Sequence, residues 1–344
     1  MKLIGLDIGT NYTKATKNGK DIIIFPSLVA YTGETDWVLK KEGKVTYIGD
    51  EALHLVQNLE DMEELRPIQG GRLIHASYIE LAKHALSKLN VEGKGLLVST
   101  GLPVKSSRYE RNELMKSLSK ALNAKILIFP QPVGTLAYMG IDTGVCIDIG
   151  FGTTDVAALA YMEFLRGDTI LVGVDKLYEN LEITIRNKMG IGLTPEEITK
   201  LLIVEGYEVG RIRSGRKVSV SQDEIMDDYH RLMRSWIERI ANRVKVVLEG
   251  LSTAIIDRIV ATGGGVALPG VYDELQRNFK DVGDVVIPDD PIGGNVKGYY
   301  KLAKIFLEEK EEKKEEKEKK EKEKEEKKGL KESSTTPAVK RGER

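Results

Sequence analysis

The feature that most constrains the fold is a strand-and-turn pattern that occurs twice in the chain, 141 residues apart. Residues 2–8 are mostly branched and apolar and end in Asp-Ile-Gly at a turn. Two further strand-like segments follow, at 12–17 and 22–24. Residues 145–150 and 153–160 repeat the first two runs, again with Asp-Ile-Gly at the turn. Short branched segments joined by Gly-containing turns predict antiparallel hairpins. The repeat therefore predicts two halves of similar size.

Local signals in the second half predict further elements. A third strand is expected near 169–172. Capping boxes at Thr194 and Ser221 predict two helix starts, and the second helix is expected to run to about Glu249. Between them lies a polar, Gly-containing stretch, 211–217, which is rich in Arg and Lys and is expected to form a solvated hairpin.

The charge of the chain is balanced, with 52 Lys and Arg against 53 Asp and Glu. This balance provides no overall field for binding nucleic acid or an anionic membrane, so direct nucleic-acid binding is not expected. The single cysteine, Cys146, excludes an intramolecular disulfide and indicates a reducing, cytoplasmic setting. No apolar run approaches the roughly 18 residues of a membrane span, and no membrane anchor is evident.

Residues 308–344 are expected to form a charged tail outside the folded body. Every residue from 308 to 328 is Glu or Lys, a composition that cannot build a core. Glu and Lys recur at the favourable i,i+4 spacing, so a solvated single helix is expected, followed by a disordered end.

The turn of the first hairpin carries residues suited to binding a phosphate. Asp7 ends the strand, and Gly9, Thr10 and Asn11 form the turn. Backbone N–H groups of such a turn can cradle a phosphate while the carboxylate holds a hydrated divalent cation. Lys14, on the returning strand, can reach the same anion. Taken alone, Asp-x-Gly is more often an ordinary hairpin turn, so the interpretation depends on the second copy.

The second copy supplies a matching turn, and two such turns facing each other across a cleft would clamp one nucleotide tail. Asp148 corresponds to Asp7, and either carboxylate can bind water on Mg²⁺. Opposed carboxylates and backbone donors suit phosphoryl transfer, which depends on positioning and charge neutralisation. The other candidate phosphate contacts in this turn are Gly150, Phe151, Gly152 and Thr153.

Two further segments fit such a site. Gln131 precedes a proline that favours a helix start, and a neutral amide there can orient an attacking water; the alternative is a helix residue with no chemical role. A predicted strand at 258–262 leads into three glycines that let the backbone approach a flat ligand or a phosphate closely, namely Gly263, Gly264 and Gly265. Neither a Gly-x-Gly-x-x-Gly fingerprint nor a P-loop pattern occurs, which disfavours Rossmann and P-loop folds.

In their order and spacing, these four segments resemble the motifs of the actin-like ATPases, the superfamily that also holds Hsp70 chaperones and sugar kinases. Residues 7–14 look like its first phosphate loop, 148–154 like its second and 263–270 like its adenosine loop. Gln131 matches the position that orients the hydrolytic water. The resemblance covers about residues 1–307 and looks strongest to the ParM-like plasmid-segregating actins and to small archaeal actin homologues.

The resemblance implies an α/β fold, a duplicated ribonuclease H-like (actin/Hsp70-type) two-domain ATPase with nucleotide in the interdomain cleft. Domain I is expected to comprise residues 1–134 and 295–307, and domain II residues 135–294. Segments 66–71 and 293–298 stand where the family has its two interdomain connections.

The resemblance also implies the chemistry of the site. Asp7 and Asp148 would contact Mg²⁺ through water and, with Gln131, would be the catalytic residues. The implied cofactors are ATP, with GTP as an alternative, and Mg²⁺. No motif fixes the acidic residue that binds the ribose, and Glu205 is a candidate outside the main set.

Comparison within the superfamily narrows the expected function. Sugar kinases need larger insertions than this chain has room for. Hsp70 needs an apolar linker and a substrate domain, where this chain has only Glu and Lys. FtsA and MreB attach to membranes by segments that we do not find at either end of this sequence. These points favour an ATPase that assembles into nucleotide-dependent cytoskeletal filaments for DNA segregation or cell organisation. Its expected interaction is self-association, with an adaptor or DNA-partitioning protein as a further candidate. The alternatives are a monomeric nucleotide switch that regulates a partner and, with less support, a small-molecule kinase.

Overall fold

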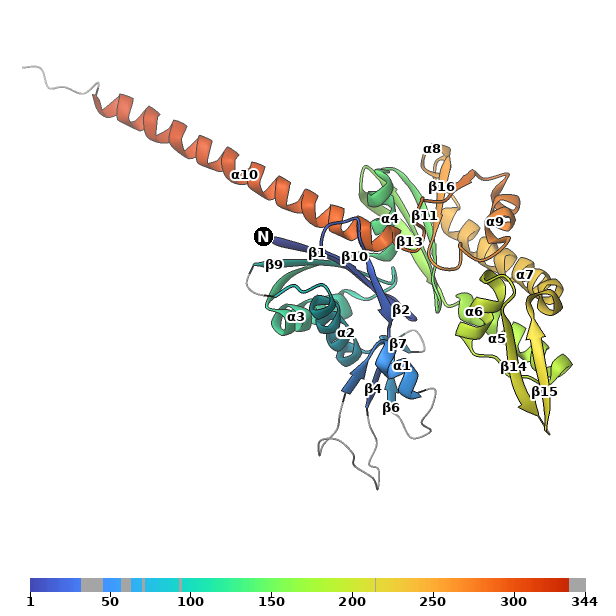
Figure 1. Cartoon of the computed structure of the whole chain (residues 1–344). Coiled ribbons are helices and arrows are strands. Elements are labelled where there is room, and N and C mark those ends of the chain that lie inside the picture. Colours follow the sequence, from blue (N-terminus) through green and yellow to red (C-terminus); the bar gives the residue numbers. More distant parts are fainter. Residues whose placement is uncertain (32–45, 57–62, 70–71, 93–94, 214, 334–344) are drawn as a thin grey trace, which may run out of the picture. The chain divides into compact units, whose positions relative to one another are not determined.

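The computed structural model describes the chain except for residues 32–45, 57–62, 70–71, 93–94, 214 and 334–344. The chain divides into two units, Met1–Ala303 and Lys304–Arg344. Two five-stranded sheets form the frame of the first unit (Figure 1).

The first sheet consists, in spatial order, of β10 (Ala124–Pro130), β9 (Leu96–Leu102), β1 (Lys2–Ile8), β2 (Tyr12–Thr16) and β3 (Ile23–Pro26). The last three strands are the antiparallel unit predicted from the first hairpin, and the first two run parallel to β1. Leu6, Val98 and Leu118 belong to the buried apolar core on one face. The helices that pack there are α2 (His75–Lys88) and α3 (Arg108–Leu122).

The second sheet repeats this arrangement with β17 (Asp284–Val286), β16 (Arg258–Thr262), β11 (Gly144–Ile149), β12 (Thr154–Ala160) and β13 (Glu163–Ile170). Its strand directions match those of the first sheet pair by pair, which confirms the predicted duplication. The third strand begins earlier than expected, because the chain turns at Tyr161 and Met162 without a glycine. The helices of its core are α5 (Val174–Met189), α7 (Gln222–Leu248) and α9 (Val271–Phe279).

Both predicted capping boxes are present. Thr194 caps α6 (Pro195–Ile203), and Ser221 caps α7, each in a reciprocal pair with the glutamate three residues later. The basic stretch between them forms the expected hairpin, which consists of β14 (Glu208–Arg213) and β15 (Arg216–Ser221).

The chain passes from the first sheet to the second through α4 (Gln131–Met139), and it returns after β17 through the start of α10 (Gly294–Ser333). These two helices cross so closely that a Cβ on Gly298 would overlap the carbonyl oxygen of Gly134. Only glycine permits this backbone contact.

The expected connection at 66–71 is wrong. Ile68–Gln69 (β7) pairs with Arg72–Leu73 (β8) inside the first half, and residues 70–71 lie outside the described part. Arg-Pro and Gly-Gly are turn signals that fit a local hairpin as well as a crossing between domains. The remaining elements of the first unit are β4 (Val29–Tyr31), β5 (Thr46–Ile48), α1 (Asp50–Val56), β6 (Glu63–Leu65) and α8 (Thr253–Ile256).

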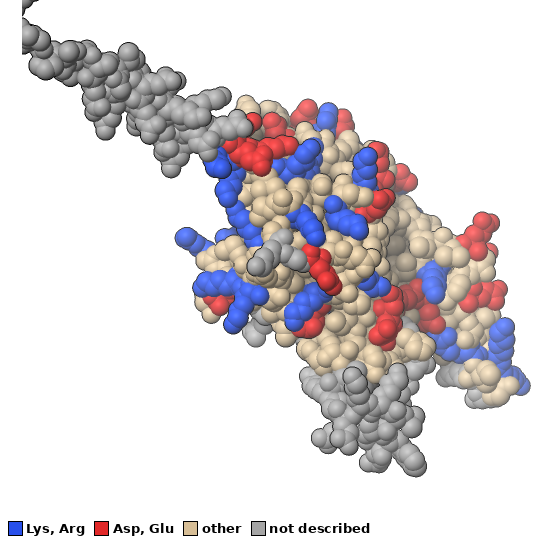
Figure 2. Space-filling view, turned by 60° about the vertical axis from the view of Figure 1, so that its left-hand side comes forward, with Lys and Arg blue, Asp and Glu red and all other residues tan. Residues whose placement is uncertain are grey.

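Helix α10 continues through the Glu/Lys segment to Ser333, as the i,i+4 pattern predicted. The disorder expected beyond that point concerns residues 334–344, which are outside the described chain. Among the described residues, no helix has the length and apolarity needed to span a bilayer. Basic and acidic side chains are interspersed over the face seen in Figure 2.

Candidate functional site

A cavity of about 350 Å³ lies where the two hairpin turns meet. The start of α4 and the glycine loop after β16 contribute to its wall. The predicted residues that line it are Asp7, Gly9, Thr10, Asn11, Lys14, Gln131, Asp148, Gly150, Phe151, Thr153, Gly263, Gly264 and Gly265. Gly152 lies just behind the wall, where a Cβ would be 3.1 Å from the hydroxyl of Thr10. Four segments that are far apart in the sequence therefore converge on one cavity.

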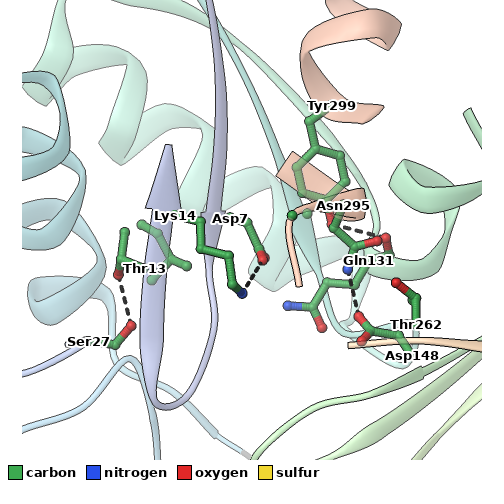
Figure 3. A network of polar contacts seen from close by, with 12 residues as sticks. Asp7, Thr13, Lys14, Ser27, Gln131, Asp148, Thr262, Asn295 and Tyr299 are labelled. Carbon is green, nitrogen blue, oxygen red and sulfur yellow. Dashed lines mark hydrogen bonds and ion pairs between the residues drawn. The ribbon is translucent and has the colours of Figure 1, made fainter. Parts of the chain in front are cut away.

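In the first hairpin, a buried ion pair stands beside the cavity. Asp7 and Lys14 lie opposite each other in the β1–β2 pairing, and Lys14 Nζ donates to Asp7 Oδ2 at 2.9 Å (Figure 3). Burial alone would lower the pKa of Lys14, but nearby carboxylates, Asp7 above all, raise it beyond its ordinary value. The lysine therefore keeps its charge next to the cavity.

The second hairpin has the same backbone geometry but a different pair of side chains. The N–H of Gly150 donates to the carbonyl of Thr153 at 2.9 Å, and the equivalent bond closes the first turn. The residue opposite Asp148 in the β11–β12 pairing is Asp155. A carboxylate therefore occupies the position that Lys14 holds in the first copy.

Asp148 lies in a strongly negative electrostatic environment. Burial, together with the carboxylates of Asp7 and Asp155, raises the pKa of Asp148 from 3.8 to about 7. Asn295 Nδ2 donates to Asp148 Oδ2 at 2.7 Å, and this bond, with the charge of Lys14, opposes the increase. An added cation would relieve the repulsion, which is the electrostatic condition for a divalent metal near this carboxylate.

Asp155 is the main residue that the sequence reasoning missed. It is buried and accepts hydrogen bonds from the N–H of Val104 and from the hydroxyls of Thr153 and Thr169. Burial raises the pKa of Asp155 to about 6. Extending the 141-residue repeat by a few positions would have found it, because Asp155 aligns with Lys14.

Gln131 is the first residue of α4, and its side chain points into the gap between the Asp7–Lys14 pair and Asp148 (Figure 3). The hydroxyl of Tyr299 donates to the backbone carbonyl of Gln131 at 3.0 Å and fixes the helix start. Gln131 therefore begins a helix, as the proline pattern predicted, and its amide lies between the Asp7–Lys14 pair and Asp148.

The glycine loop packs directly on the second hairpin. Gly263 has a φ of +91°, and a Cβ there would collide with the carboxylate of Asp148. The N–H of Gly265 donates to the carbonyl of Ile149 at 2.9 Å. Gly264 faces open space, with no heavy atom within 4 Å of where a Cβ would be. The loop thus leaves room for a ligand beside its backbone.

Much of the remaining cavity wall is apolar. Tyr178 and Thr199 add hydroxyls there that bond to each other at 2.9 Å. Glu205, the candidate for a ribose contact, does not line the cavity. Charged and apolar lining residues together suit a ligand with a polyanionic part and a flat ring. The apolar and aromatic wall includes Val174, Tyr178, Ile203, Leu268 and Ile292.

The two carboxylates of the cavity could bind a cation only if other oxygen ligands completed its coordination. Within the described part of the chain, no group of three or more His, Cys, Asp or Glu side chains is placed to hold a metal ion. Asp7 and Asp148 could each supply an oxygen, so water or ligand oxygens would have to complete the coordination.

A family model described as "MreB/Mbl protein" matches residues 1–312. The chain belongs to the MreB/Mbl family. Among its relatives, the cell shape-determining protein Mbl of Bacillus subtilis is 27% identical over 320 residues, covering 84% of this chain and 92% of that protein.

Solved structures of similar fold include MreB5 of Spiroplasma citri bound to ADP, with a TM-score of 0.73 at 22% identity, covering 90% of this chain and 98% of that one. A MamK double helical filament has a TM-score of 0.71 at 18% identity, covering 88% and 98%. The predicted actin-type fold is therefore confirmed.

The MreB/Mbl match corrects one part of the sequence interpretation. The superfamily was predicted correctly, and an archaeal actin homologue is among the solved structures of similar fold, with a TM-score of 0.66 at 21% identity. The chain itself belongs to the MreB/Mbl family, and a ParM-like type is not supported. MreB-type proteins were disfavoured from the sequence because a membrane-attaching segment was expected in them. That exclusion was wrong, because the MreB/Mbl model matches residues 1–312.

Proposed function

We propose that this chain binds and hydrolyses ATP with Mg²⁺ and assembles into nucleotide-dependent cytoskeletal filaments. The observation that carries the proposal is the cavity between two hairpins of matching backbone geometry, in a chain of the MreB/Mbl family. The ADP bound to MreB5 and the filament formed by MamK support it. The name of the relative Mbl favours cell shape or organisation over DNA segregation as the role.

In this proposal the two turns hold the phosphates of ATP. Their backbone N–H groups donate to phosphate oxygens, and Lys14 adds an ammonium group at the same end. Asp7 and Asp148 hold Mg²⁺ through water, and the bound ion supplies neutralisation of the phosphate charge. The apolar part of the wall, with the open backbone at Gly264, takes the base. The ADP bound to MreB5 favours ATP over GTP as its source.

We assign residues 1–134 and 295–307 to domain I and residues 135–294 to domain II. The two sheets, the crossing through α4 and the return through the start of α10 support this division.

Hydrolysis needs a positioned water and an acceptor for its proton. Gln131 orients the water through its side-chain amide. Asp155 is the acceptor, because three hydrogen-bond donors leave one of its roughly four lone-pair sites free. With a pKa of about 6, Asp155 is mostly ionised at neutral pH and is suited to act as a general base.

Two measurements test this function together. Phosphate release is followed with ATP or GTP, with and without Mg²⁺, and the same samples are sedimented and imaged by negative stain. Asp148→Ala should abolish turnover, whereas Asp281→Ala, at an exposed carboxylate outside the cavity wall, should not. Hydrolysis without polymer over a wide range of concentration, salt and temperature would support the monomeric switch instead. Transfer of phosphate to a small molecule would support a kinase.

A further inference from the structure

Asn295 is a buried amide at the cavity wall that the proposed reaction does not use. It is the second residue of α10, directly after Gly294. A Cβ on Gly294 would be only 2.9 Å from the hydroxyl of Thr135 on α4. The glycine therefore lets the start of α10 approach α4, and the side chain of Asn295 reaches both α4 and the second hairpin.

The hydrogen bonds of Asn295 fix the orientation of its amide. The side-chain oxygen accepts from the backbone N–H of Thr135 at 3.1 Å and from the hydroxyl of Thr135 at 2.7 Å. A backbone N–H can only donate, so the oxygen must face Thr135 and the nitrogen must face away from it. The nitrogen donates to Asp148 Oδ2 at 2.7 Å (Figure 3). The amide is therefore locked between α4 and the carboxylate of Asp148.

Asp148 depends on this amide for its own position. Within the described part of the chain, Asn295 is the one residue that donates a hydrogen bond to the carboxylate of Asp148. On the other side of the carboxylate, a Cβ on Gly263 would collide with Asp148 Oδ1. The carboxylates of Asp7 and Asp155 repel Asp148, and the bond from Asn295 opposes that repulsion. The amide thus holds a charged group where its neighbours disfavour it.

The first hairpin holds its carboxylate in a different way. Asp7 accepts from the ammonium group of Lys14, which compensates its charge. Asn295 is neutral, so it orients Asp148 without compensating the charge. A carboxylate that keeps its charge and has a fixed position is suited to bind water on a divalent cation. Asp148 is therefore better prepared than Asp7 to hold the ion.

We infer that Asn295 is a positioning residue for Mg²⁺, because its amide holds the carboxylate of Asp148 in the orientation that contacts the hydrated ion. The inference rests on the proposed function and adds a residue that acts only through Asp148. Groups that hydrogen-bond to a metal-binding side chain commonly contribute about 10–100-fold to metal affinity. The contribution of Asn295 is expected at the lower end of this range, about ten-fold, because water separates the carboxylate from the ion.

The effect of Mg²⁺ on ADP affinity tests the inference without any hydrolysis. Calorimetry gives the affinity for ADP in EDTA and in excess Mg²⁺, and we name the quotient of the two affinities the Mg²⁺ ratio. Asn295→Leu introduces a side chain of similar size that has no polar atoms. It should lower the Mg²⁺ ratio about ten-fold while changing the ADP affinity in EDTA by no more than about two-fold.

Thr262→Val is the matched control. The buried hydroxyl of Thr262 lies 3.2 Å from the hydroxyl of Thr135 and donates to the carbonyl of Pro291 at 2.9 Å. The substitution removes a polar group from the same cluster but leaves the bond between Asn295 and Asp148 in place. The Mg²⁺ ratio of Thr262→Val should stay within about two-fold of the wild type, whatever its melting temperature.

Exchanging the two side chains gives a second test that preserves the hydrogen bond. In the double variant Asp148→Asn/Asn295→Asp, the amide at position 148 can donate to the carboxylate at position 295, which can still accept from Thr135. The fold is therefore kept, whereas the carboxylate moves to the place of the amide. The Mg²⁺ ratio should fall at least about ten-fold. This variant decides the question even where Asn295→Leu does not fold.

Each other outcome contradicts the inference. A wild-type Mg²⁺ ratio in Asn295→Leu would show that Asp148 contacts the ion without this amide. Equal losses of ADP affinity in EDTA and in Mg²⁺ would give Asn295 a structural role. A wild-type Mg²⁺ ratio in the exchanged variant would show that the position of the carboxylate does not matter. These three results leave the proposed function standing, whereas a wild type that binds no ADP, or whose ADP affinity ignores Mg²⁺, would reject both.

Discussion

Replacing Asp148 by Asn is expected to stabilise the ligand-free protein at alkaline pH. Asp148 is 8% exposed, and its pKa rises from 3.8 to about 7 on folding. The folded state therefore keeps a proton that the unfolded chain releases, so the free energy of unfolding falls as the pH rises between these two values. An asparagine carries no charge, and its side-chain oxygen can still accept the hydrogen bond from Asn295.

The size of the effect follows from the pKa difference. Three pKa units correspond to about 4 kcal/mol, of which about 2 kcal/mol or slightly more develops between about pH 5 and about pH 8. For a body of this size, 1 kcal/mol changes the melting temperature by about 2 °C. The melting temperature of Asp148→Asn relative to wild type should therefore rise by about 4 °C across that pH range.

Thermal melts of the wild type, Asp148→Asn and the exposed-site control Asp281→Asn, each with and without ATP and Mg²⁺, measure this effect. The nucleotide and cation should stabilise the wild type more than Asp148→Asn, since the variant lacks one carboxylate for the hydrated ion. Asp148→Asn should therefore be more stable than the wild type at alkaline pH without ligand, and should gain less stability than the wild type from ATP and Mg²⁺. Wild type and Asp148→Asn curves that stay parallel across the pH range would refute the reasoning, because they would show that folding does not perturb this carboxyl group.

Three further predictions test other parts of the structure. Gln131→Ala should keep ATP affinity, measured by calorimetry, within about two-fold while slowing phosphate release about 100-fold, because an orienting amide acts in the transition state; equal losses would indicate a structural role. Gly298→Ala should lower the melting temperature by several degrees, at a cost of about 1–3 kcal/mol or more, because the methyl group overlaps Gly134, whereas Gly264→Ala meets open space and should melt like the wild type. Truncation after Leu307 should leave the melting temperature and ATP turnover unchanged, since the removed Glu/Lys segment contributes no core; a large drop in either would show that this segment packs on the body.

The sequence was informative where a signal is local. The capping boxes at Thr194 and Ser221 and the two Asp-Ile-Gly turns are complete within a few residues, so they could be predicted before any tertiary contact was known. The cavity residues Asp7 and Asp148 followed from the same repeat.

What could not be predicted depends on packing between distant segments. Asn295 reaches Asp148 only because the chain returns across the molecule at the start of α10, and nothing near Asn295 in the sequence indicates that bond. The tight turn at Tyr161 and Met162 lacks the Gly or Asn that normally marks such a turn, so the third strand was expected too late. Tertiary contacts, not local preference, decide both features.

The crossing of α4 over the start of α10 has a mechanical consequence. Gly134 and Gly298 bring the two backbones together, and Asn295 and Tyr299 of α10 pack directly on Gly134. Hydrogen bonds from Thr135 to Asn295 and from Tyr299 to the carbonyl of Gln131 couple the two helices. Because Asn295 also bonds to Asp148, a shift of α4 against the start of α10 would be transmitted directly to this carboxylate.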